Sequence, residues 1–170
     1  MSSIEAIRAA LPEVAKDMRL NLPKVLNEGS LSEAQRWGVA LASAYASRNP
    51  SLIEAIKNDG AAHLSPEHLG DAQAANSLMG MNNIYYRFRH MISKPEYGSM
   101  PAGLRMNHIA KPMSDKATFE LMSIAVSAIN GCEMCIRAHE DELVKHGVSA
   151  AQIHDAVRIA AVIHATAVSL

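Results

Sequence analysis

The residues with the clearest capacity for chemistry are two cysteines separated by two residues, Cys132 and Cys135, which are the only cysteines in the chain. Thiols at this spacing at the start of a helix lie about one turn apart on the same face, so their sulfurs can approach closely enough to form a disulfide. The N-terminus of a helix also stabilises a thiolate, through its dipole and its unpaired N–H groups. The spacing therefore predicts a redox-active dithiol.

A histidine and a glutamate are placed to serve this dithiol. His139 follows Cys135 by four positions and so shares its helical face, where it can accept a proton from a thiol or pass one to a leaving oxygen. Glu120 precedes the Asn130-Gly131 turn by about as many residues as His139 follows it, and at about 1.5 Å per residue the two reach similar heights in an antiparallel helix pair. We therefore expect a proton relay from glutamate through histidine to cysteine.

Three other interpretations of the cysteine pair compete with a redox-active dithiol. A thioredoxin-like motif needs a strand before it, whereas the residues before these cysteines have a helical pattern. Two cysteines can also be small buried hydrophobic residues. A zinc site would need a fourth ligand of suitable spacing, and none is recognisable among the candidates, so no metal is predicted. The possible zinc ligands are Cys132, Cys135 and His139, with His146, His154 or His164 as the fourth.

The composition predicts an all-α protein that forms a single domain over residues 1–170. Aromatic residues make up 4% of the chain, while alanine and methionine are abundant, and such a composition favours helices over sheets. Capping residues, prolines and glycines place the helices. The expected ranges are 4–10, 12–27, 33–47, 50–62, 66–91, 115–129, 132–146 and 149–170, with an ordered loop at 94–103 that packs onto the rest of the chain.

The two halves of the chain resemble each other, which predicts a duplicated helical unit covering about 32–92 and 114–170. The first blocks align at a separation of 82 residues, which places Trp37 opposite Phe119 and Pro50 opposite Cys132. The second blocks align at a separation of 84. Because the first unit has no cysteine, we expect only the second to carry the chemistry.

Charge and hydropathy exclude several classes of function. The net charge is −1 and no long basic run is present, so a nucleic-acid partner is not expected. No apolar run reaches membrane-spanning length, and the N-terminal residues lack the pattern of a signal peptide. We therefore expect a soluble, cytoplasmic protein with no membrane partner. In that reducing compartment a cysteine pair is more often catalytic than a structural crosslink.

The segment from Phe119 to Cys132, followed by Cys135 and by Ala138-His139-Glu140, resembles the AhpD group of alkyl hydroperoxidases within the carboxymuconolactone decarboxylase-like superfamily. The similarity extends upstream through Asn82-Asn83, Tyr86-Arg87, His90 and the stretch 103–106, and so covers the whole chain. The resemblance implies an all-helical domain built on a repeated unit and assembled as a homotrimer.

The resemblance also implies roles for the four site residues. Cys135 would attack the peroxide and become a sulfenic acid. Cys132 would donate a proton, close the disulfide and form the mixed disulfide with a partner. Glu120 and His139 would form the proton relay. The family often has a histidine immediately before the second cysteine, and this chain has Met134 there, so the relay is shorter.

By the same resemblance the chain would bind no cofactor and would take electrons from dihydrolipoamide. Its partners would be the lipoylated acyltransferase subunit of a 2-oxo-acid dehydrogenase and the peroxiredoxin AhpC. We thus expect an antioxidant oxidoreductase that reduces alkyl hydroperoxides or a disulfide substrate. One alternative is a decarboxylase of a small lactone acid, the other activity in the superfamily, which needs no dithiol. Another is a non-enzymatic helical protein that senses redox state.

Overall fold

The structure, a computed structural model, describes residues 3–170, and over that range it is built from helices without a β-strand. This confirms the predicted all-α fold. The elements in chain order are α1 (Ile4–Ala10), a 3-10 turn (Glu13–Ala15), α2 (Lys16–Asn27), α3 (Glu33–Ser47), α4 (Pro50–Asp59), α5 (Pro66–Ile92), α6 (Pro95–Ser99), α7 (Asn107–Ala110), α8 (Lys116–Asn130), α9 (Glu133–Lys145) and α10 (Ala150–Ser169).

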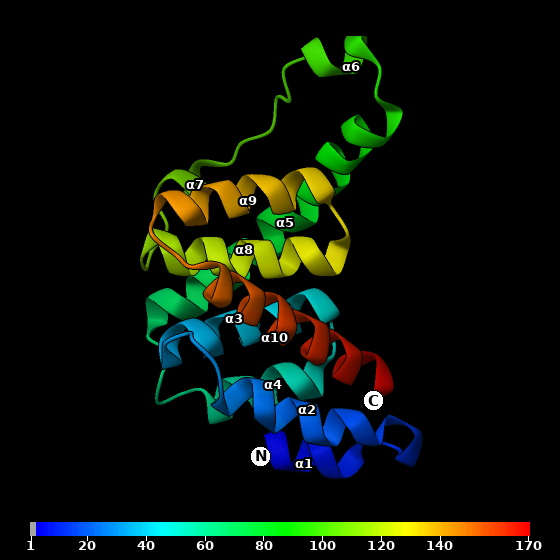
Figure 1. The fold of residues 1–170 in the computed structure, drawn as a ribbon, viewed down its shortest axis with the longest axis vertical. Coiled ribbons are helices and arrows are strands. Elements are labelled where there is room, and N and C mark those ends of the chain that lie inside the picture. The colour runs from blue at the N-terminus through cyan, green and yellow to red at the C-terminus, as the bar shows by residue number, and fades with distance from the viewer. Residues whose placement is uncertain (1–2) are drawn as a thin grey trace.

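Helices α3 and α8 form the centre of the bundle. They pack against each other and against α5 and α10, and α9 lies along α8 (Figure 1). Every residue of α8 from Thr118 to Ser127 is buried, because this helix is apolar on nearly all of its faces. Glu120, one of the predicted site residues, therefore lies in the interior of the protein.

Two series of three helices, α3–α4–α5 and α8–α9–α10, follow each other with matching caps. The corresponding N-cap residues lie 83, 83 and 84 positions apart: Ser32 and Asp115, Asn49 and Cys132, and Ser65 and Ser149. The first helix of each series ends in a left-handed residue, Arg48 in one and Gly131 in the other. The fold is thus built on a duplicated helical unit, as predicted.

The two units are joined by a reciprocal pair of contacts. Asp71 on α5 accepts hydrogen bonds from the main-chain N–H and the hydroxyl of Ser114, which precedes α8. Asp155 on α10 accepts the same two bonds from Ser30, which precedes α3. The last helix of each unit therefore holds the entry to the first helix of the other.

The N-caps align the first two helices of each unit at a separation of 83 residues, one more than the predicted separation of 82. At a separation of 83, Trp37 corresponds to Glu120, while Leu52 and Ile56 correspond to Cys135 and His139. All three side chains of the first unit are apolar and buried. The positions that carry chemistry in the second unit thus hold core side chains in the first.

The segment after α5 departs from the expectation that it packs onto the protein. Figure 1 shows α6 standing apart from the bundle, joined to it by the end of α5 and by the chain leading to α7. Most residues from 93 to 105 are exposed and none belongs to the buried core, because few of them are apolar. No helix among the described residues is long and apolar enough to cross a bilayer.

Candidate active site

The turn between α8 and α9 brings the two cysteines together. Gly131 ends α8 with a φ of 67°, a left-handed conformation that glycine adopts without strain. Cys132 then caps α9, and the N–H of Cys135 lies 3.4 Å from its sulfur. The Cα atoms of Cys132 and Cys135 are 5.3 Å apart and their sulfurs form a disulfide. The prediction that the pair begins a helix and lies on one face is therefore confirmed.

A buried polar network holds this turn from the side of α5. The side-chain amide of Asn83 donates to the hydroxyl of Ser127 at 2.9 Å, and its oxygen accepts from the side chain of Asn130 at 3.0 Å. Arg87 donates to the main-chain oxygen of Asn130. These bonds satisfy polar groups that would otherwise be buried unpaired, and they restrict the turn to one arrangement.

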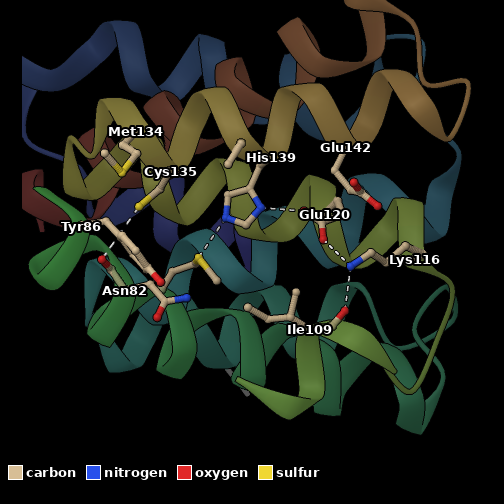
Figure 2. A pocket seen from close by; sticks show the side chains of 11 residues that line it. Asn82, Tyr86, Ile109, Lys116, Glu120, Met134, Cys135, His139 and Glu142 are labelled. Atoms are coloured by element: carbon tan, nitrogen blue, oxygen red, sulfur yellow. Dashed lines mark hydrogen bonds and ion pairs between the residues drawn. The ribbon is translucent and has the colours of Figure 1, made fainter. Parts of the chain in front are cut away.

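Glu120 and His139 contact each other in the interior, as predicted from their similar distances from the turn at Asn130-Gly131. Nδ1 of His139 lies 2.6 Å from Oε2 of Glu120, and the two side chains belong to the antiparallel helices α8 and α9 (Figure 2). The other carboxylate oxygen of Glu120 lies 2.7 Å from Nζ of Lys116, which also donates to the main-chain oxygen of Ile109 at 2.7 Å. Both carboxylate oxygens are thus occupied by charged or chargeable donors.

These donors keep Glu120 ionised. Burial by itself would raise the pKa of the Glu120 carboxyl, but hydrogen bonds and charge from His139 and Lys116 outweigh burial and hold that pKa below its ordinary value. An ionised Glu120 requires a proton on Nδ1 of His139. Nε2 is therefore the ring nitrogen left to exchange a proton with the cavity.

In this oxidised form of the site, His139 and Cys135 do not form a hydrogen bond with each other. Nε2 of His139 lies 3.1 Å from the sulfur of Met79, and the sulfur of Cys135 lies 3.9 Å from the main-chain oxygen of Asn82. Both residues nevertheless face the same space. The structure thus joins the glutamate–histidine half of the predicted relay directly, and brings the cysteine to it through a shared cavity.

That cavity measures about 450 Å³ and lies between α5, α8 and α9. Its lining is mainly apolar, with Lys116, Glu120, His139 and Glu142 on one side and Cys135 beside Asn82 on the other (Figure 2). The complete lining is Met79, Asn82, Tyr86, Ile109, Lys116, Glu120, Met134, Cys135, Ala138, His139 and Glu142. Cys132 is fully buried and is not part of it. Cys135 is therefore the sulfur that a molecule in the cavity would meet.

Three residues of this site were not predicted from the sequence. Lys116 could have been found, because it precedes Glu120 by four positions on the same helix. Met79 and Asn82 lie on α5, some fifty residues from the cysteines, and no spacing rule brings them there. Among residues 3–170 no three potential metal ligands converge.

Comparison with known proteins identifies relatives of this chain. Residues 95–170 match the family model described as the carboxymuconolactone decarboxylase family. A protein of Anaeromyxobacter dehalogenans (strain 2CP-C) is 56% identical over 170 residues, covering 100% of this chain and 91% of the relative. Proteins of Rhodospirillum centenum and Maricaulis maris are 52% and 51% identical over 168 residues, covering 99% of this chain and 90% and 97% of the relatives. All three are named alkyl hydroperoxide reductase AhpD.

Proposed function

The chain belongs to the AhpD group of the carboxymuconolactone decarboxylase family, and from this membership we propose that it is a thiol-dependent alkyl hydroperoxide reductase whose redox couple is Cys132 and Cys135. The observation that carries the proposal is the disulfide-bonded pair beside a cavity into which the Glu120–His139 pair also faces. An apolar lining suits a hydroperoxide with an alkyl or aryl group.

The reaction begins with the reduced pair. The thiolate of Cys135 attacks the terminal oxygen of the hydroperoxide, the O–O bond breaks, and the alkoxide leaves with a proton to become an alcohol. Cys135 is then a sulfenic acid. The thiol of Cys132 attacks its sulfur and releases water, so that the disulfide forms. The pair has lost two electrons and the hydroperoxide has gained them.

Glu120 and His139 supply protons to these steps. The ionised Glu120 orients the imidazole, so Nε2 of His139 can take the proton of the thiol and return it to the leaving alkoxide. In this sequence the residue before Cys135 is Met134, which lines the cavity but carries no exchangeable proton. His139 is then the single imidazole that serves the site from α9.

The disulfide must be reduced for turnover. We assign this step to a dithiol such as dihydrolipoamide, which becomes a disulfide as Cys132 and Cys135 return to thiols. A lipoylated acyltransferase would carry that group and the peroxiredoxin AhpC would be a further electron acceptor, both in the cytoplasm. The protein would assemble as a homotrimer. Exposed apolar side chains on the end of α5 and beside α6, which include Phe88, Met91 and Met100, form a surface that association between copies could cover.

Steady-state turnover of cumene hydroperoxide with dihydrolipoamide as reductant tests the proposal. Wild-type protein should oxidise the dithiol only when peroxide is present. Cys135→Ser should abolish peroxide consumption and leave no sulfenic acid to trap, since it removes the attacking sulfur. Cys132→Ser is the matched control, because it should still form a trappable sulfenic acid in one turnover. Normal turnover by Cys135→Ser would refute the assignment, and turnover by neither variant nor wild type would favour the decarboxylase or a redox sensor.

A further inference from the structure

One residue in the wall of the active-site cavity carries an unpaired oxygen. The side chain of Asn82 is buried, with 5% of the residue exposed, and its Oδ1 has no hydrogen-bond partner. Of the buried polar side-chain atoms without a partner among residues 3–170, it alone belongs to a residue that lines this cavity. Buried polar groups in proteins are nearly always paired, so an unpaired one at a cavity wall indicates a missing ligand.

The neighbouring asparagine shows that the fold can satisfy such a group at this level of α5. Asn83 is also buried, yet its amide is bonded to Ser127 and Asn130. Asn82 points instead toward the space between α5 and α9, where Figure 2 shows its side chain next to Tyr86 and below Cys135. The main-chain oxygen of the same residue lies 3.9 Å from the sulfur of Cys135.

We infer that Asn82 is the residue that binds and orients the hydroperoxide, with its Oδ1 accepting a hydrogen bond from the terminal O–H of the substrate. The inference rests on the proposed function and adds a binding residue to it. A hydroperoxide has one strong donor, and Oδ1 of Asn82 is an unpaired acceptor on a residue that lines the cavity together with Cys135. The bond would hold the terminal oxygen near Cys135 and leave the alkyl group against the apolar part of the cavity.

The hydrogen in this bond stays on its oxygen throughout the reaction. Cys135 attacks the terminal oxygen, the O–O bond breaks, and the electron pair leaves with the alkoxide, which takes its proton from elsewhere in the site. The hydroxyl that is transferred becomes the S–O–H group of the sulfenic acid. Oδ1 of Asn82 can therefore accept from the substrate before the step and from the sulfenic acid after it.

The same oxygen is less suited to the reductant. A thiol is a weak hydrogen-bond donor compared with the O–H of a hydroperoxide. Asn82 is therefore expected to act in the peroxide half of the cycle.

The test is Asn82→Leu, which keeps the size of the side chain and removes its polar group. Rapid mixing measures two half-reactions separately: reduced protein with cumene hydroperoxide, and oxidised protein with dihydrolipoamide. We expect the peroxide rate constant to fall about tenfold, as for a lost neutral hydrogen bond. The ratio of the peroxide to the dithiol rate constant should fall by a similar factor. The melting temperature should not fall, since an unpaired buried oxygen has been replaced by carbon.

Asn76→Leu is the matched control on α5. Asn76 is half-buried and lines a separate polar cavity with Arg48 and Asn130, so this variant should keep both rate constants. Equal losses in both half-reactions of Asn82→Leu, together with a lower melting temperature, would indicate a structural role and overturn the inference. A loss confined to the dithiol step would assign the oxygen to the reductant and overturn it as well. Wild-type protein that reduces no hydroperoxide would instead refute the proposed function.

Discussion

Replacing Glu120 by glutamine tests whether the buried carboxylate organises the site. In the folded protein its two oxygens lie 2.6 Å from Nδ1 of His139 and 2.7 Å from Nζ of Lys116. A glutamine has one acceptor oxygen and one NH₂ group, so only one of these two donors can still be accommodated. The substitution changes no volume and therefore isolates the charge and the second acceptor.

The cost can be worked out from these two contacts. A hydrogen bond to a charged group contributes about 1.5–3 kcal/mol and a neutral one about 0.5–1.5 kcal/mol. Losing one charged bond and weakening the other should therefore cost about 3 kcal/mol. For a chain of 170 residues, where 1 kcal/mol corresponds to about 2–4 °C, the melting temperature should fall by about 6–12 °C.

Calorimetry at pH 7 measures this loss, and the same measurement at lower pH tests its origin. Because the pKa of Glu120 is lowered from 4.5, the ionised carboxylate stabilises the fold fully above about that pH and less as the pH falls through the folded-state pKa. The difference between wild type and Glu120→Gln should therefore shrink at pH 3. In the turnover assay, kcat/KM for cumene hydroperoxide should fall about 100-fold, a size typical of lost proton transfer.

Glu142→Gln is the control, because it makes the same change at the cavity rim. Its carboxylate is 34% exposed and paired with Lys145 and His146, and exposed ion pairs contribute little to stability, so the melting temperature should hardly change. Equal melting temperatures for the two variants, or a difference that persists unchanged at pH 3, would refute the reasoning.

Four further substitutions test the site and the contacts between the two helical units. His139→Gln should lower peroxide turnover, because it removes the group that exchanges a proton with the site, and unchanged turnover would remove His139 from the relay. Lys116→Met should cost about 2 kcal/mol by calorimetry, less than Glu120→Gln, because it leaves the His139 bond in place; a cost equal to or larger than that of Glu120→Gln would contradict this. Asp71→Ala should cost about 3 kcal/mol in urea unfolding and more than Asp155→Ala, because Asp71 is fully buried and holds more bonds; the reverse order would contradict it.

Much of the candidate site could be predicted because it depends on positions along two consecutive helices. A turn at Asn130-Gly131 makes those helices antiparallel, so equal distances along them bring Glu120 and His139 to the same level. The cysteine pair follows from the cap at Cys132, which is equally local. The ion pair of Lys116 with Glu120 has the same local origin.

The part that could not be predicted comes from α5. Met79 and Asn82 reach the site through packing of helices that are distant in the sequence, and helix periodicity does not specify which helices meet. The exposed position of α6 has a similar cause, since it depends on the length by which α5 extends beyond the bundle (Figure 1).

The sequence by itself determined the helical class, the duplicated unit and the alignment of Cys132, Cys135, His139 and Glu120, because helix rise, periodicity and capping are local properties of the chain. Only the tertiary structure decided that Cys135 opens into a cavity while Cys132 is enclosed, and that Oδ1 of Asn82 is left without a partner there. Burial and hydrogen-bond pairing depend on every element that surrounds a side chain, and these elements come together only in the folded protein.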